Sequence, residues 1–121
     1  MKLIALRPMI WTADLTATVD FYIHVLGFTC ENRNDAWGWA ALLKDEVEIM
    51  IALPNEHTPF NGPKFTGSFY MNTDNVDALW ESLKEKVKVA YPIESFEYGM
   101  REFAIYDNNG YLLQFGQELD Y

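Results

Sequence analysis

The feature that most constrains the fold of this chain is a pattern that occurs twice. A β-type run at residues 4–12 precedes an amphipathic helical pattern, and a second β-type run at residues 68–73 precedes another. The two junctions between run and helix, residues 12–15 and 73–76, have similar sequences and lie about half the length of the chain apart. The sequence therefore predicts two copies of one structural unit.

Each predicted helix has one apolar face and a capping signal at its start. Apolar residues recur at helical spacing over residues 14–26, and Asp14 is placed as the N-cap. In the second helix either Asp74 or Asn75 is the N-cap, and the apolar stripe includes Trp80. Both helices therefore need a sheet face on which to bury one side.

Three further strand-like stretches follow each helix, at residues 28–33, 37–43 and 47–53 and at residues 89–96, 101–106 and 111–115. The order strand, helix and three strands predicts an α+β fold of two βαβββ modules, residues 1–53 and 67–121. A linker with three prolines, residues 54–66, joins the modules within a single domain, residues 1–121.

Composition restricts the classes of partner. Hydrophobic residues make up 50% of the 121 positions and aromatic residues 16%, which is enough to form a core. Eighteen acidic residues against nine basic ones give a net charge of -9, the wrong sign for binding nucleic acid or an anionic membrane. A single cysteine, Cys30, excludes a disulfide scaffold, and no apolar run is long enough to cross a bilayer. We therefore expect a soluble, cytoplasmic protein with a neutral or cationic partner.

Strand alternation assigns the side chains of each predicted strand to two faces. In the strand at 47–53, Val47, Ile49 and Ile51 face one way, whereas Glu48 and Met50 face the other. The wholly apolar faces must lie under the helices. The opposite faces, which we call the mixed faces, carry Arg7, Met9, Trp11, Glu48, Ser68, Tyr70, Asn72 and Gln114. The mixed faces are the candidate site.

The candidate ligand-binding residues are Trp11, Trp37, Trp39, Glu48, Met50, Phe60, Tyr70, Asn72 and Gln114. Trp37 and Trp39 share one face of their predicted strand, and Phe60 lies in the linker. Trp80, by contrast, is expected in the core under the second helix. Flat aromatic walls in an acidic chain are suited to an aromatic or cationic small molecule, because stacking and cation–π contacts contribute roughly 0.5–2 kcal/mol each.

Several polar residues have a structural interpretation beside the functional one. Glu48 and Arg7 either contact a ligand or pair with each other or with Arg101. For Arg101 and Glu102 we favour a role in sheet packing. The two histidines, His24 and His57, are expected at the surface, and Cys30 is expected to be a packed side chain rather than a nucleophile.

Two strings resemble a known family when they are taken together. Residues 21–28 read FYIHVLGF and residues 99–110 read GMREFAIYDNNG. With the two βαβββ halves and Pro8 in the first strand, they resemble the vicinal oxygen chelate superfamily, most closely its glyoxalase/bleomycin-resistance branch, over nearly the whole chain. The resemblance implies that the modules curl into an open, barrel-like sheet in a homodimer whose clefts are built from both chains.

The resemblance also implies four positions at which enzymes of the superfamily hold a divalent metal. Carried over to this chain, they are Arg7, Glu48, Ser68 and Gln114. Arginine has no lone pair to donate, and neutral serine and glutamine oxygens are weak ligands. Only Glu48 suits a metal, so we expect neither a metal nor another cofactor, and no catalytic residue is assigned.

The sequence therefore favours a metal-free binding protein of the bleomycin-resistance type, which sequesters an aromatic or cationic, antibiotic-like ligand in a dimer cleft. Whether the chain is an enzyme stays open. The alternative is a metal-dependent enzyme of the same superfamily, such as a glyoxalase-like lyase, a thiol transferase or a dioxygenase. A third interpretation, a scaffold that docks another protein, fits less well, because polar groups are scattered across the mixed faces as in a ligand site.

Overall fold

The computed structural model describes residues 1–55, 57 and 59–120, so Glu56 and Thr58 of the predicted linker lie outside the described residues. The chain divides into two compact units, Met1–Gly62 and Pro63–Tyr121. Each unit is described by itself.

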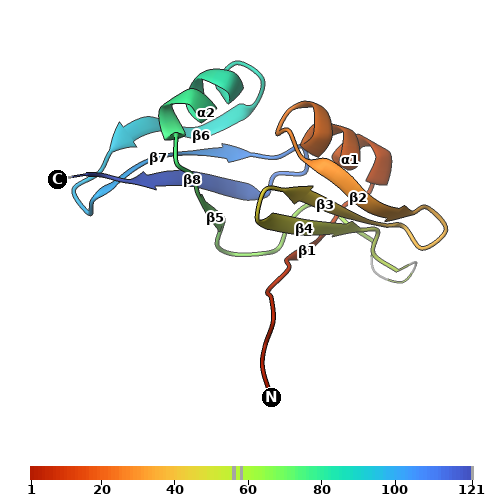
Figure 1. The fold of residues 1–121 in the computed structure, drawn as a ribbon. Coiled ribbons are helices and arrows are strands. Elements are labelled where there is room, and N and C mark those ends of the chain that lie inside the picture. The colour runs from red at the N-terminus through yellow and green to blue at the C-terminus, as the bar shows by residue number, and fades with distance from the viewer. Residues whose placement is uncertain (56, 58, 121) are drawn as a thin grey trace. The chain divides into compact units, whose positions relative to one another are not determined.

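The first unit is a βαβββ module. It consists of β1 (Met9–Trp11), α1 (Leu15–His24), β2 (Thr29–Asn34), β3 (Trp39–Lys44) and β4 (Val47–Ala52). The four strands form one sheet in the order β1-β4-β3-β2, in which β1 runs parallel to β4 and the other pairs are antiparallel (Figure 1).

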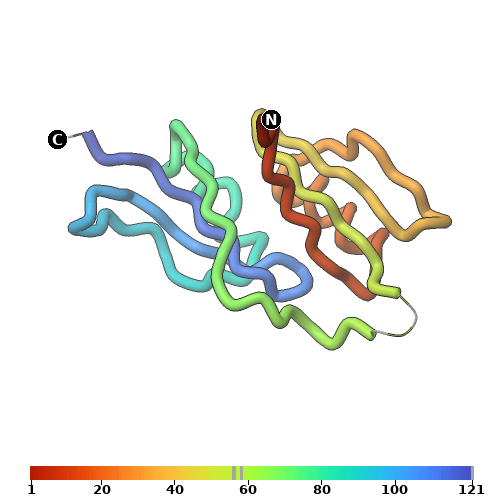
Figure 2. The backbone as a smooth tube through the Cα atoms, turned by 90° about the horizontal axis from the view of Figure 1, so that it is seen from below, coloured from red at the N-terminus to blue at the C-terminus, as the bar shows by residue number. Residues whose placement is uncertain are grey.

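The second unit repeats this topology. It consists of β5 (Phe69–Asn72), α2 (Val76–Leu83), β6 (Lys88–Ser95), β7 (Met100–Tyr106) and β8 (Leu112–Glu118). The sheet order is β5-β8-β7-β6, and Figure 2 shows β5 beside β8 just as β1 lies beside β4. The predicted α+β class and the two βαβββ modules are therefore confirmed, with two open sheets.

Both helices begin at the predicted capping residues. The side chain of Asp14 accepts a hydrogen bond from the N–H of Ala17 at 3.0 Å, and the side chain of Asn75 accepts one from Ala78 at 3.1 Å. Of the two caps considered for the second helix, Asn75 is therefore the one used. Each such bond satisfies a backbone donor that the helix leaves without an internal partner.

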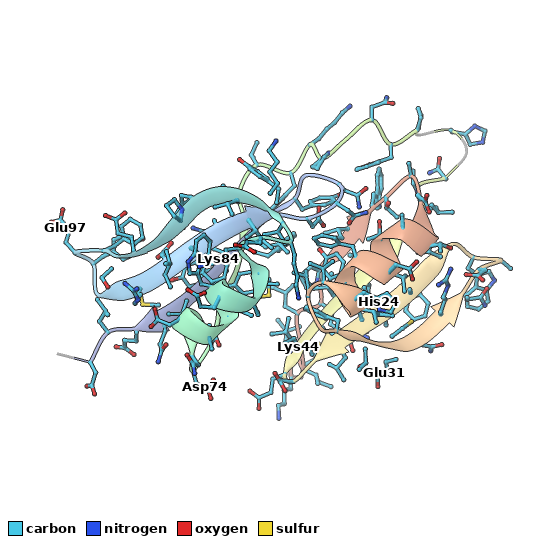
Figure 3. The ribbon with its side chains drawn as sticks, turned by 90° about the horizontal axis from the view of Figure 1, so that it is seen from above. His24, Glu31, Lys44, Asp74, Lys84 and Glu97 are labelled. Atoms are coloured by element: carbon cyan, nitrogen blue, oxygen red, sulfur yellow. The ribbon has the colours of Figure 1, made fainter. Side chains whose placement is uncertain are left out.

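In each unit the helix covers one face of the sheet, and the core lies between them (Figure 3). Fully buried side chains of the first core include Tyr22, Leu42 and Ile51, and those of the second include Phe103 and Leu113. The predicted apolar faces are thus confirmed as core faces. None of the helices described is long and apolar enough to cross a membrane.

The first strand is shorter than the sequence predicts. Residues 4–8 lie outside β1, and the start of the chain extends away from the sheet (Figure 1), although the carbonyl of Pro8 still accepts a hydrogen bond from the N–H of Met50 at 2.8 Å. The reason is the register: Met9 pairs with Met50, so residue 6 would face Val47, where β4 begins. Earlier residues have no neighbouring strand in this unit, and Leu3 and Leu6 are almost fully exposed.

Trp37 differs from its predicted position. It lies in the turn between β2 and β3, where its N–H donates to Oδ1 of Asn34, and its side chain is 78% exposed. Gly38 follows and ends the turn with a φ of +64°, a conformation that residues other than glycine rarely adopt. Because β3 begins only at Trp39, the prediction that Trp37 and Trp39 share a strand face is wrong.

Trp80 is less deeply buried than predicted. Its ring lies 5.1 Å from the ring of Phe103, measured between centroids, so it does contact the core. The side chain is nevertheless only half-buried, whereas Val76 and Leu83 of the same helix are fully buried.

Candidate functional site

The second unit buries a carboxylate on the mixed face of its sheet. Glu102 lies in β7 and is 1% exposed. Its neighbour Arg101 points to the helix side, where it donates to Asp77 of α2 at 2.9 Å, so Glu102 points to the other side. Burying a charged group is costly unless hydrogen bonds replace its water, and such bonds surround this one.

Four side-chain donors reach the two oxygens of Glu102. Oε1 accepts from the hydroxyls of Tyr70 at 3.1 Å and Tyr98 at 2.6 Å. Oε2 accepts from the hydroxyl of Tyr91 and from Nε2 of Gln114 at 3.3 Å. A carboxylate offers about four lone-pair sites, so its accepting capacity is full. We call these five side chains the tyrosine cluster.

A glycine makes the room that Tyr70 occupies. In the sheet register Glu102 lies opposite Gly116 of β8. A Cβ atom placed on Gly116 would lie only 2.6 Å from Cζ of Tyr70 and would overlap its hydroxyl. The absence of a side chain at Gly116 therefore lets the Tyr70 ring cross β8 and reach Glu102.

Gln114 links the tyrosine cluster to Ser68, the residue before β5. Its Oε1 accepts from the hydroxyl of Ser68, and its Nε2 donates to the hydroxyl of Tyr91 at 2.7 Å. Every polar atom of the Gln114 amide is thereby engaged. This network fixes the side chain without any added ion.

Aromatic rings surround the buried carboxylate. The ring of Tyr98 stacks on Phe96 with centroids 5.3 Å apart and an interplanar angle of 5°, and Phe96 meets the ring of Tyr91 edge-on at 5.9 Å. Tyr98 is 65% exposed and Tyr70 is 40% exposed. The outer surface of the tyrosine cluster is thus aromatic, with a negative charge directly beneath it.

The tyrosines of the cluster are held in their protonated form. Burial and the hydrogen bond to Glu102 raise the pKa of Tyr70 to about 12. The same two causes raise the pKa of Tyr91, and for Tyr98 the hydrogen bond to Glu102 is the main cause of a raised pKa. All three hydroxyls therefore act as donors at neutral pH.

The mixed face of the first unit has a different character. Arg7 donates to Oε2 of Glu48 at 2.8 Å, which confirms the pairing that the sequence left open. Met9 pairs with Met50 and Trp11 pairs with Ala52 across β1 and β4, and Trp11 is 42% exposed. This face is therefore mainly apolar, with one ion pair near its end.

The predicted site residues fall into three groups. Tyr70, Asn72 and Gln114 share the mixed face of the second unit, because they occupy neighbouring register positions of β5 and β8. A second group lies in the first unit and consists of Trp11, Trp39, Glu48 and Met50. Trp37 and Phe60 lie outside the strands, in the β2–β3 turn and in the linker.

Sequence reasoning missed three members of the tyrosine cluster. The sequence favours a packing role for Glu102 together with Arg101, and Arg101 does link α2 to β6 by donating to Asp77 and to Ser95. The one sequence signal for the position of Glu102 is strand alternation in β7, which places its side chain on the face opposite the core residue Phe103. Strand alternation assigns no clear face to Tyr91 or Tyr98, since Tyr91 follows a register shift in β6 and Tyr98 lies in a turn.

The residues at the implied metal positions do not fit a divalent metal. Thr12 donates its N–H to the carbonyl of Ala52, and Thr73 donates to that of Gly116, so Ala52 and Gly116 are equivalent in the two modules. Met50 and Gln114 lie two residues before Ala52 and Gly116, respectively, so Met50 is the counterpart of Gln114 in the first module. Glu48, the position that the resemblance implies, is not that counterpart. Neither a thioether nor an engaged amide suits a hard cation.

The chemistry of the remaining carboxylates agrees with this. Glu48 is paired with Arg7, and all four lone-pair sites of Glu102 are taken by donors. Within the described part of the chain, no group of three or more histidine, cysteine, aspartate or glutamate side chains is arranged to hold a metal ion. We therefore derive no reaction through a metal.

The architecture and the sequence match one family model over most of the chain. The model describes the glyoxalase/bleomycin resistance protein/dioxygenase superfamily and matches residues 5–115. The chain belongs to this superfamily. A comparison with curated proteins gave no significant match.

Solved structures share the fold at low sequence identity. TioX from Micromonospora sp. ML1 is 18% identical with a TM-score of 0.79, over 94% of this chain and 98% of TioX. TnmS3, an antibiotic binding protein from Streptomyces sp. CB03234, is 20% identical with a TM-score of 0.79, over 98% of both chains. A bleomycin resistance determinant encoded on the transposon Tn5 is 18% identical with a TM-score of 0.77, over 96% of this chain and 98% of that one.

Proposed function

We propose that this superfamily member is a metal-free binding protein that sequesters an aromatic or cationic small molecule, as an antibiotic-binding protein does. The observation that carries the proposal is the tyrosine cluster, in which exposed aromatic rings lie over the buried carboxylate of Glu102. Tyrosine rings offer stacking and cation–π contacts, and the carboxylate adds an attractive charge for a cation.

The charge of the chain supports a cationic or neutral ligand. The net charge of -9 attracts cations toward the protein and repels anions. Residues 63–121 alone contain ten acidic and five basic side chains, so the unit that holds the tyrosine cluster is itself acidic.

We propose further that the protein is a homodimer and that each ligand is held in a cleft to which both chains contribute. The support is that exposed apolar and aromatic side chains, including Met9, Trp11 and Tyr70, gather on the mixed faces. Faces of this kind are normally covered by a partner or a ligand.

The alternative enzyme function would require a divalent metal bound through Glu48 and further ligands. Two measurements on the purified protein separate the two functions. Native mass spectrometry should show an organic molecule that co-purifies with the protein, and calorimetric titration with nickel, zinc, manganese and iron(II) should show no tight site. A one-to-one metal site of micromolar or better affinity that disappears in Glu48→Gln would contradict the binding function and favour the enzyme.

A further inference from the structure

We infer that Glu102 anchors a positively charged N–H group of the ligand, such as a protonated amine or an amidinium, and that this group takes the place that the hydroxyl of Tyr98 occupies in the free protein. The inference rests on the proposed function and names the class of ligand for the same site. It also assigns roles to two residues, Glu102 as the anchor and Tyr98 as a displaceable cover.

The first step of the argument concerns the charge of Glu102. Its four hydrogen-bond partners are neutral groups, three tyrosine hydroxyls and one amide. The neighbouring cation, Arg101, points to the opposite face and pairs with Asp77. Within the described residues no cation pairs with Glu102, so its negative charge is solvated by dipoles and not neutralised. A ligand cation would supply that missing charge.

The second step identifies the donor that can be exchanged. Tyr91 is half-buried on β6, and its hydroxyl also accepts from Gln114. Tyr70 lies on β5 with its ring across Gly116. Tyr98 lies in the turn between β6 and β7, next to Glu97, which Figure 3 shows at the tip of that hairpin. It is the most exposed tyrosine of the cluster, so moving it uncovers the least buried surface.

The third step concerns the chemistry of the exchange. The hydroxyl of Tyr98 and an N–H of a cation both make charge-assisted hydrogen bonds to the carboxylate, but only the cation adds Coulomb attraction between opposite charges. An N–H of a cation can therefore replace the Tyr98 hydroxyl at Oε1 with a more favourable interaction energy. A quaternary ammonium has no N–H and cannot use this lone pair, although it can still contact the aromatic rings.

The rings around Glu102 suit a flat group that carries the cation. Phe96 and Tyr98 are stacked on each other, and Tyr91 meets Phe96 edge-on. If the Tyr98 side chain swings aside, it leaves the face of Phe96 open for a planar ring of the ligand. The N–H group and the ring would then contact Glu102 and Phe96 together.

Three acridine probes with nearly the same ring system test this inference. Aminoacridine is a cation with N–H donors, N-methylacridinium is a cation without them, and acridine is neutral at mildly alkaline pH. Calorimetric titration should show that the wild-type protein binds aminoacridine about 10- to 100-fold more tightly than acridine, which is the range for a hydrogen bond to a charged group. N-methylacridinium should bind at least about 10-fold more weakly than aminoacridine by the same reasoning.

Two variants that each remove a charge and one that removes a hydroxyl test whether Glu102 causes the preference for aminoacridine. Glu102→Gln should abolish the preference for aminoacridine and change the affinity for acridine by less than about threefold. Glu94→Gln is the matched control, because Glu94 pairs with Glu102 in the sheet but is exposed and lies outside the tyrosine cluster, so the preference should remain. Tyr98→Phe removes the competing hydroxyl and should leave the affinity for aminoacridine unchanged or raise it.

The outcomes separate this inference from the proposed function. Equal affinity of the wild-type protein for all three probes would overturn the inference and leave small-molecule binding intact, and this result does not depend on any variant folding. An equal loss of preference in Glu94→Gln and Glu102→Gln would also overturn it, since the cause would then be the general charge of the face. Binding of none of the three probes would contradict both.

Discussion

Four segments of the second unit each contribute a hydrogen-bond donor to the side chain of Glu102. Its donors come from β5, β6, the β6–β7 turn and β8, so the tyrosine cluster can form only when the whole sheet has formed. Each hydroxyl and amide proton replaces a water molecule that the carboxylate loses on burial. The cluster therefore contributes to the specificity of the fold as well as to a ligand site.

The sequence could predict only part of this arrangement at the level of single residues. Strand alternation predicts Tyr70 and Gln114 on one face, because it holds through the regular pairing of β5 and β8. Tyr91 could not be placed, because register shifts on either side of it in β6 break the alternation. Tyr98 lies in a turn, where no periodicity assigns a direction.

The raised tyrosine pKa values predict a loss of stability in alkali. Tyrosine in the unfolded chain titrates near 10.0, whereas the pKa of Tyr70 in the folded protein is about 12. The contribution is fully present below about pH 10 and is lost as pH rises toward 12, because there the folded protein binds more protons than the unfolded chain. Urea midpoints measured across this range should fall, and Tyr70→Phe should make the fall shallower. The same slope in both proteins would contradict this.

Gly116→Ala should destabilise the protein through a clash with Tyr70. The added Cβ would overlap the Tyr70 hydroxyl, so the ring must leave Glu102, and we expect a loss of about 1–3 kcal/mol in the free energy of unfolding. Denaturant unfolding measures it. In a Tyr70→Ala background the same substitution should cost less by at least about 0.5 kcal/mol, since its clash partner is gone. Additive losses would show that the two residues do not interact.

Whole elements were easier to predict than single contacts. Both helices and the eight strands of the described residues follow from periodicity and capping residues, whereas the parallel pairing of β1 with β4 and of β5 with β8 is seen only in the structure. The ends of elements were less predictable. Residues 4–8 have the composition of a strand, yet β4 begins at Val47 and offers no partner to the residues before residue 6. Trp37 lies in a turn that Gly38 completes.

Trp80 tests the packing of α2 on its sheet. Trp80→Ala removes the ring that contacts Phe103, but because the side chain is half-buried we expect a loss of about 1–3 kcal/mol, below the range of about 3–5 kcal/mol for a fully buried tryptophan. Trp37→Ala is the matched control and should be nearly neutral, since Trp37 is exposed in a turn. Thermal unfolding of both variants measures the difference, and similar losses would contradict the assignment of these positions.

For the whole molecule, the family was evident from two strings and a repeated module, whereas the ligand was not. The fold depends on periodicity that many sequences share, as the solved structures at 18–20% identity show. The site depends on individual side chains on the mixed faces, and these are free to differ between members of a family with one fold.

The proposed homodimer predicts a definite mass in solution. Light scattering at micromolar concentration should give about twice the 14.0 kDa of one chain. The physical reason is the exposure of apolar side chains on the mixed faces and at residues 1–6, which a second copy would cover. A stable mass of one chain across the concentration range would exclude the shared cleft.

The central claim is that the protein binds a flat cationic molecule at the tyrosine cluster without a metal. Titration with aminoacridine in the presence and absence of a metal chelator tests it most directly. We predict saturable one-to-one binding per chain that the chelator does not change and that Phe96→Ala together with Tyr70→Ala weakens by about 10-fold or more, as expected when aromatic contacts of roughly 0.5–2 kcal/mol each are lost. Binding that requires a metal, or that survives the loss of both rings, would contradict this claim.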